Sequence, residues 1–85
     1  MRSWDPSFTV EASGDRPRFV QIAQALSAEI RRGRLRPGDP LPSSRVLAHS
    51  LGVHRNTILA AYAELRAEGW IVSVPARGTF VSQAL

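Results

Sequence analysis

The chain has 85 residues, and 11 basic side chains against 7 acidic ones give it a formal net charge of +4. A chain of this length forms one small domain, whose modest core rarely also encloses a deep catalytic cleft. Every basic residue is an arginine, so chemistry that needs a lysine amine is excluded from this chain. The absence of cysteine excludes disulfides, thiolate metal sites and a cysteine nucleophile, and fits a cytoplasmic protein.

Residues 1–14 show no sustained hydrophobic period and are predicted to form an N-terminal leader or arm, with at most a short strand at residues 8–10. They do not resemble a signal peptide. The longest uninterrupted apolar run, residues 58–63, is far too short to cross a bilayer. No membrane association is therefore expected.

A first amphipathic helix is expected after Asp15, which is a typical capping residue, with Pro17 in the first turn. Apolar residues recur at helical spacing from Phe19 to Ile30, and Gly33 is expected to end the helix in a left-handed conformation. Four arginines gather at this end, where we expect them to complement the helix dipole and flank a solvated loop: Arg31, Arg32, Arg34 and Arg36.

A turn-rich connection over residues 34–40 precedes a second, short helix. This helix is predicted to open at Pro42-Ser43-Ser44 with a serine as its N-cap, and to stop at Gly52. Its inner face is predicted to comprise Val46, Leu47 and Leu51.

A longer third helix is predicted from about residue 54 to residue 68, with an apolar stripe of Ile58, Ala61, Tyr62 and Leu65. Strands at residues 70–74 and 79–81 then flank a turn at residues 75–78. The predicted fold is mainly α with a small β-hairpin, a winged helix-turn-helix of three helices plus a two-stranded wing. It spans residues 15–82, and residues 83–85 begin a linker.

The distribution of charge points to DNA. Residues 40–63 contain no carboxylate, whereas Arg45 and Arg55 each fall in the first turn of a predicted helix. A cation is disfavoured at a helix N-terminus unless an anion such as phosphate lies nearby. In a helix-turn-helix the second helix enters the major groove, where Arg55, Asn56 and Thr57 offer groups that complement base edges or phosphate.

Several other positions carry side chains that could bind or react. His54 is expected to contact phosphate or to cap the helix, and its spacing from His49 does not suit a shared metal ion. Arg77 and Gly78, at the predicted wing tip, are candidates for the minor groove. Glu64 and Glu68 share a helical face, but without a cleft they indicate a solvated surface and not an acid/base pair. No enzymatic activity is expected.

Several motifs also follow one another at a specific spacing: Gly33-Arg34-Leu35-Arg36-Pro37-Gly38-Asp39, Leu41-Pro42-Ser43-Ser44-Arg45, Leu51-Gly52-Val53, Arg55-Asn56-Thr57 and Gly78-Thr79-Phe80-Val81. Over roughly residues 17–82 this pattern resembles the GntR family of bacterial transcriptional regulators. The serine pair and the Arg-Asn-Thr triplet are most similar to the MocR subfamily. Its members join such a domain to a C-terminal aminotransferase-like domain that binds pyridoxal phosphate.

The resemblance implies that Arg45 and Arg55 contact bases and phosphates, with Ser43 and Ser44 beside them, and that the Gly78 loop is the wing tip. It also implies a shared core of Leu35, Leu41, Leu47, Leu51, Val53, Ile58, Leu65 and Phe80. Two positions depart from the pattern. His54 replaces a residue that is often a small hydroxyl, and Ala76 replaces a frequent glycine, so its methyl group is expected to push the wing outward and leave Arg77 to reach the groove.

The expected partner is therefore operator DNA, with at most a weak homodimer for the isolated domain. The alternative is a winged-helix protein-interaction module that does not bind DNA. No cofactor is expected in this chain. If the resemblance extends to the whole protein, an effector-binding domain lies C-terminal, and any lysine that binds pyridoxal phosphate lies beyond Leu85.

Overall fold

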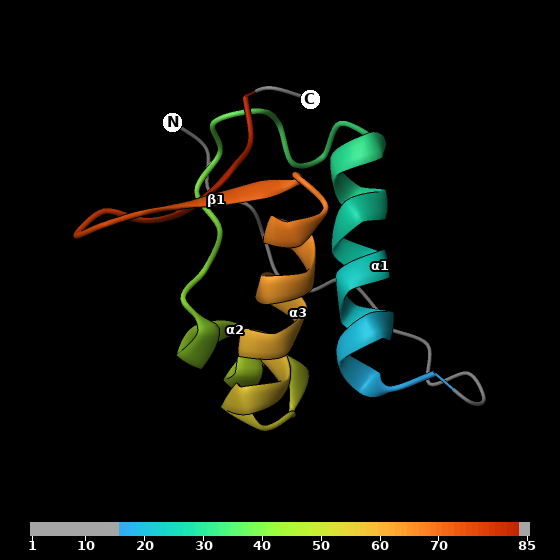
Figure 1. The fold of residues 1–85 in the computed structure, drawn as a ribbon. Helices are drawn as coiled ribbons and strands as arrows, with labels where there is room; N and C mark the ends of the chain where they lie inside the picture. The colour runs from blue at the N-terminus through green and yellow to red at the C-terminus, as the bar shows by residue number, and fades with distance from the viewer. Residues whose placement is uncertain (1–15, 84–85) are drawn as a thin grey trace.

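The computed structural model describes residues 16–83, so the predicted leader, its strand at residues 8–10 and Asp15 lie outside the described part of the chain. Within it, the helices α1 (Arg18–Arg31), α2 (Ser44–Leu51) and α3 (Arg55–Ala67) precede the strands β1 (Ile71–Val74) and β2 (Gly78–Val81) (Figure 1). The two strands form an antiparallel hairpin. The predicted winged helix-turn-helix fold is confirmed.

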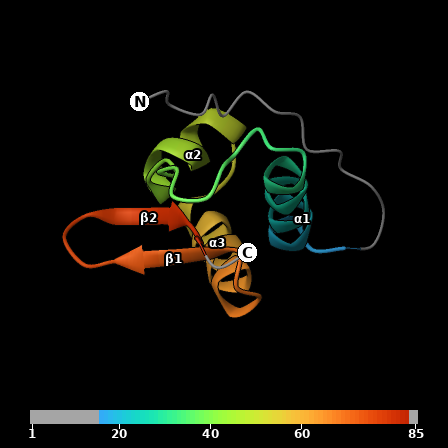
Figure 2. The same cartoon turned by 90° about the horizontal axis from the view of Figure 1, so that it is seen from above.

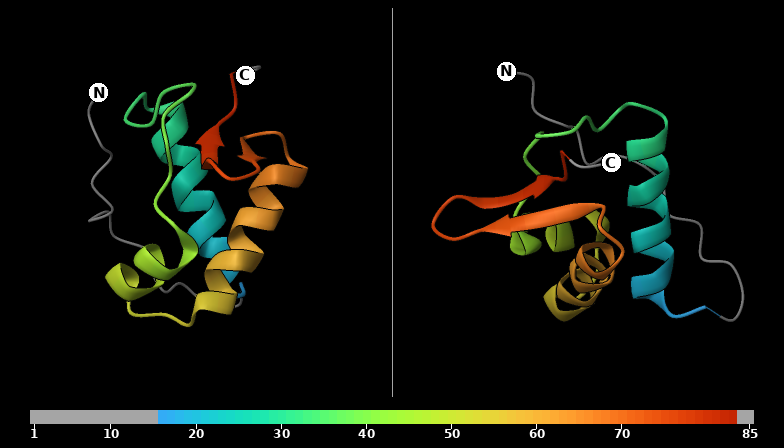
Figure 3. Two further views of the ribbon diagram at one scale, coloured as in Figure 1. Left: turned by 90° about the vertical axis from the view of Figure 1, so that its left-hand side faces the viewer. Right: turned by 45° about the horizontal axis from the view of Figure 1, so that its top comes forward.

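The helix α3 packs against both α1 and α2. Figure 1 shows the hairpin extending away from α1, and Figure 2 shows α2 beside α3. The hairpin extends beyond the helices as a wing, and its turn is the part of the described chain that projects furthest (Figure 3). This arrangement leaves the wing free of cover from α1.

The N-terminal cap of α1 differs from the prediction. Pro17 occupies the N-cap position, and its carbonyl oxygen accepts the amides of Val20 and Gln21 at 3.1 and 3.2 Å. A proline side chain has no acceptor, so α1 has no side-chain cap. The expectation that Pro17 lies inside the first turn was therefore wrong, whereas the capping role expected of Asp15 falls outside the described residues. Gly33, in contrast, has the predicted left-handed conformation, with φ at 81°.

The apolar stripe predicted for α3 is confirmed, because Ile58, Ala61, Tyr62 and Leu65 are all buried. They meet α1 through Ile22, Ala23, Leu26 and Ile30, and Leu35, Leu41, Leu47 and Ala48 complete this side of the core. The hairpin contributes Ile71 and Val81, while Leu51 and Val53 pack against the core from its edge. One continuous core thus fixes α3 against every other element.

Two predicted core positions were wrong. Val46 is 54% exposed, and Ala48 takes its place on the inner face of α2. Successive residues of a helix are about 100° apart, so Val46 and Ala48 lie on opposite sides of the buried Leu47. Phe80 is only half-buried, because strand side chains alternate between faces and the core face of β2 belongs to Val81, which pairs with Ile71.

The connection before α2 contributes a third segment to the wing. The amide of Leu41 donates to the Thr79 carbonyl at 2.8 Å, and the amide of Val81 donates to the Asp39 carbonyl at 2.9 Å. Pro40 forms an isolated antiparallel bridge with Phe80. The sequence predicted only a turn-rich connection here, yet these bonds satisfy the edge of β2 and hold the base of the wing against the body of the domain.

A buried hydroxyl fixes α3 relative to the start of α2. The Tyr62 hydroxyl donates a 2.7 Å hydrogen bond to the carbonyl of Pro42, one residue before the N-cap of α2. Burial raises the pKa of Tyr62, so the hydroxyl keeps its proton and remains a donor. This bond helps to set the position of the N-terminus of α2 against α3, where the candidate site lies.

Candidate nucleic-acid interface

The turn between α2 and α3 is short and depends on one glycine. Gly52 ends α2 in the left-handed conformation, with φ at 68°, and its amide and that of Val53 donate back to the carbonyls of His49 and Ala48. A side chain at this φ is strained, which explains why glycine suits the turn. With α3 starting at Arg55, the N-terminus of the second helix follows almost immediately.

Ser43 caps α2, as predicted for a serine at this point. Its hydroxyl oxygen accepts the backbone amide of Val46 at 3.2 Å. The hydroxyl proton is left to donate elsewhere. Ser43 is therefore a structural residue that fixes the first turn of α2, whatever contact it also makes with a ligand.

His54 caps α3, which agrees with one of the two roles predicted for it. Its Nδ1 accepts the backbone amide of Asn56 at 3.0 Å. An imidazole nitrogen that accepts a hydrogen bond carries no proton, so the neutral ring has its proton on Nε2. That N–H belongs to an exposed side chain and is available to donate to an anion.

Replacing His54 by alanine is expected to lower the free energy of unfolding by about 1 kcal/mol, because α3 loses its capping acceptor. A serine at the same position retains an acceptor and is expected to keep most of this stability. Urea denaturation of the three proteins measures the difference. His49→Ala is the control, since His49 is an exposed residue in the last turn of α2; equal losses at both histidines would contradict the capping role.

The two arginines at the helix N-termini have different surroundings. The Nε–H of Arg55 donates a 2.9 Å hydrogen bond to the hydroxyl oxygen of Ser44, so the first residues of α2 and α3 are joined. Arg45 is exposed and makes no hydrogen bond or ion pair with any described residue. Asn56 is exposed and Thr57 is half-buried in the first turn of α3. The structure thus brings Ser43, Ser44 and Arg45 on α2 close to the beginning of α3.

The wing tip contains a turn that is unusual for its sequence. The amide of Arg77 donates to the Val74 carbonyl at 3.0 Å, which closes a four-residue turn with Pro75 and Ala76 at its centre. Ala76 has φ at 63°, a conformation for which this turn normally requires glycine. Gly78 pairs with Val74 as the first residue of β2, so the turn is one residue shorter than predicted. Arg77 is exposed at the tip.

Replacing Ala76 by glycine is expected to raise the free energy of unfolding by about 0.5 kcal/mol, the relief of left-handed strain less the added flexibility of the unfolded chain. The matched control is Ala63→Gly at an exposed position inside α3, where the same change is expected to cost about 1 kcal/mol. Urea denaturation distinguishes the two signs, and a loss of stability at both positions would show that Ala76 is not strained.

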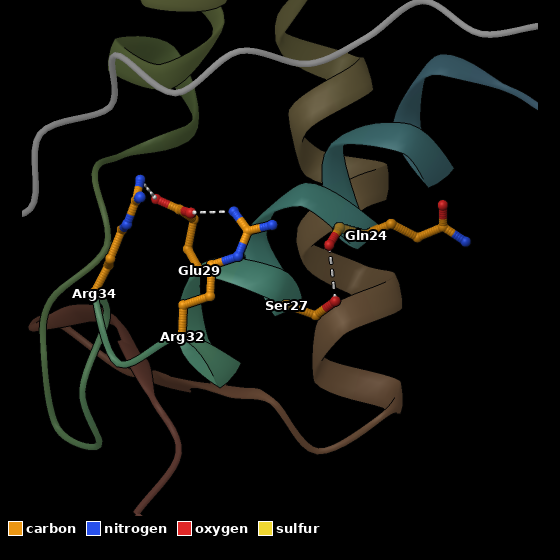
Figure 4. Close-up of polar contacts among 5 residues, drawn as sticks. All are labelled: Gln24, Ser27, Glu29, Arg32 and Arg34. Atoms are coloured by element: carbon orange, nitrogen blue, oxygen red, sulfur yellow. Dashed lines mark hydrogen bonds and ion pairs between the residues drawn. The ribbon is translucent and has the colours of Figure 1, made fainter.

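The four arginines at and after the end of α1 are all exposed, as expected, but two of them also pair with a carboxylate for which no such role was predicted from the sequence. Glu29 is 4% exposed, and its carboxylate lies 3.7 Å from an Nη atom of Arg32 and 3.6 Å from one of Arg34 (Figure 4). The two arginines approach this carboxylate from either side. Their charge is thus partly neutralised within the domain, whereas Arg31 and Arg36 have no ion pair among the described residues.

Features of other classes of site are not evident in the described residues. They contain no group of three or more metal-ligating side chains that could hold a metal ion. None of their helices has the length and apolar character needed to traverse a bilayer. The pKa of Glu64 is raised by a hydrogen bond with Glu68, by partial desolvation and by the charge of Glu68. Glu68 is exposed and also accepts a hydrogen bond from Trp70.

Comparison with known protein families identifies one model, described as bacterial regulatory proteins of the gntR family, which matches residues 19–81. The transcriptional regulator TauR of Rhodobacter capsulatus is 41% identical over 78 residues, which are 92% of this chain and 16% of that protein. The regulatory protein MocR of Rhizobium meliloti is 38% identical over 73 residues, 86% of this chain and 15% of the relative. The chain thus spans about one sixth of the length of these relatives.

Solved structures agree with these relatives. YtrA from Sulfolobus acidocaldarius, described as a GntR-family transcription factor, superimposes with a TM-score of 0.84 at 38% identity, covering 93% of this chain and 83% of that one. The DNA-binding domain of AraR in complex with the operator ORE1 superimposes with a TM-score of 0.76 at 30% identity, covering 88% of this chain and 94% of that domain. The second comparison places a domain of the same fold on operator DNA.

Proposed function

Because the chain belongs to the GntR family of bacterial regulatory proteins, we propose that it is the DNA-binding domain of a transcriptional regulator and that it recognises specific sequences in double-stranded operator DNA. The observation that carries this proposal is the junction of α2 and α3, where two arginines stand at helix N-termini in a stretch without carboxylates. Such a surface needs an anion to balance it, and phosphate is the anion that helix N-termini bind.

The exposed side chains divide into groups that suit different parts of DNA. With α3 in the major groove, Arg55 and Asn56 carry the donors and acceptors that distinguish guanine and adenine. Arg45, the Nε2–H of His54 and the hydroxyls of Ser43 and Thr57 suit phosphate oxygens. Arg77 and the adjoining backbone at Gly78 suit the minor groove, where narrow A·T tracts concentrate negative potential.

The proposal extends to the protein of which this domain forms part. The short coverage of TauR and MocR supports an additional, C-terminal effector domain, which in a MocR-like arrangement would bind pyridoxal phosphate. Since this chain contains no lysine, it cannot supply the amine that holds that cofactor. A regulator of this kind would act in the cytoplasm on paired half-sites, with weak pairing at most between isolated domains.

Selection of bound sequences from a random pool of DNA duplexes tests the proposal directly. We expect one recurring motif. We also expect the log of the binding constant to fall with the log of the salt concentration with a slope of about −4, as for a module that neutralises about four or five phosphates. Recovery of unrelated sequences would refute specific recognition. No binding to any duplex at low salt would refute DNA binding and favour a protein-interaction module.

A further inference from the structure

The Arg55–Ser44 hydrogen bond restricts how Arg55 can meet a base. A guanidinium group offers N–H donors on Nε and on both Nη atoms. Here Nε is occupied by the Ser44 hydroxyl oxygen at 2.9 Å. The donors that remain available to a base are those of the two Nη atoms, which form a planar fork at the end of the guanidinium group. This fork matches the O6 and N7 acceptors of guanine in the major groove.

The position of Ser44 is itself well determined. Ser43 caps α2 through the Val46 amide, and Tyr62 holds the Pro42 carbonyl at 2.7 Å, so the backbone on the N-terminal side of Ser44 is fixed from two directions. Ser44 is half-buried, whereas Arg55 is exposed. A fixed, short side chain on α2 therefore holds a long, flexible one on α3. Arg45, the next residue, has no comparable partner among the described residues.

We propose that Ser44 is a positioning residue for base recognition, which holds the Arg55 guanidinium with its Nη fork directed outward to read one guanine. The bond reduces the number of conformations that Arg55 would otherwise lose on binding, and it favours the end-on approach over the alternatives. The hydroxyl proton of Ser44 is free to donate to a neighbouring phosphate while its oxygen accepts from Arg55. This inference rests on the proposed function. Arg45, which no described residue holds in place, is assigned to a phosphate contact, for which orientation matters less.

The test uses the 85-residue chain and the duplex recovered from the random pool, together with duplexes in which one guanine is replaced by each other base. The guanine read by Arg55 is identified as the one whose replacement lowers the affinity of the wild-type chain but not that of Arg55→Ala. For Ser44→Ala we expect the discrimination between these duplexes to fall about fivefold, because the fork is no longer held. Ser44→Thr keeps the hydroxyl and is expected to restore most of the discrimination. Adding Ser44→Ala to Arg55→Ala is expected to cause no further loss of discrimination between these duplexes.

The matched control is Ser73→Ala, which removes a similar exposed arginine–serine hydrogen bond, from Arg66 Nη1 at 3.3 Å, and is expected to leave the discrimination unchanged. Unaltered discrimination in Ser44→Ala would overturn the inference. The inference would also fail if Ser44→Ala lowered the discrimination by the same factor in the Arg55→Ala background as in the wild-type chain. If the wild-type chain itself shows no preference among duplexes, the proposed function fails as well. Thermal melting of each variant confirms that folded proteins are compared.

Discussion

Arg55→Ala is expected to weaken binding to the selected duplex by about 1–3 kcal/mol and to abolish the preference for one base pair. Arg55 is the first residue of α3, is exposed, and donates to Ser44 through Nε, which leaves its Nη atoms available to a base. Its loss removes a bidentate contact that distinguishes guanine from other bases. Fluorescence polarisation with the selected duplex and its single-base variants measures both effects.

The control for charge is Arg66→Ala on the same helix. Arg66 lies near the opposite end of α3, about 16 Å further along the helix axis, and it donates to Ser73 on the wing. Both substitutions remove one positive charge from the domain. We therefore expect Arg66→Ala to have a much smaller effect and to leave base preference intact. Equal effects would show that Arg55 acts only through the net charge of the domain.

Ile58→Ala is expected to lower the free energy of unfolding by about 2–5 kcal/mol. Ile58 has no exposed surface and lies on the side of α3 that meets the core. A small domain has only about 5–15 kcal/mol of stability, so this cavity would remove a large share of it and loosen the helix proposed to read DNA. Urea denaturation gives the stability, and the same samples give the affinity for the selected duplex.

Leu59→Ala provides the comparison one residue further along the same helix. Leu59 is 42% exposed, so its truncation leaves little or no cavity. The expected loss of stability is within about 1 kcal/mol. A loss as large as that of Ile58→Ala would mean that the face of α3 assigned to the core is wrong, and with it the face assigned to DNA.

Hydrophobic periodicity predicted the helices and strands because each element long enough to repeat its pattern shows a single period. The stripe on α3 was correct, since a three-and-a-half-turn helix repeats its buried face several times. The short helix α2 offers few repeats, so Val46 and Ala48 could not be distinguished by spacing, and the packing of α2 against α3 decided in favour of Ala48. Phe80 was assigned to the core through the family resemblance, whereas the register with β1 gives that place to Val81.

The capping residues of the candidate site were predictable from the sequence, but the bonds between its helices were not. Capping follows local rules, so Ser43 and His54 could be assigned from neighbouring positions. The bond between Ser44 and Arg55 joins two helices, and its existence depends on their relative placement. Glu29 was missed for a similar reason. Its distance of three residues from Arg32 was a visible signal, but the contribution of Arg34 depends on how the chain turns after α1.

The pairing of residues 38–41 with β2 has a consequence for the order of folding. These segments are nearly half the chain apart in sequence, whereas the helix-turn-helix closes through contacts between neighbouring elements. Long-range pairings are slow to form, because a large loop must close before they contribute any stability. The base of the wing is therefore expected to assemble after α2 has packed against α3. Amide hydrogen exchange should accordingly find Leu41 and Val81 less protected than the buried turns of α3.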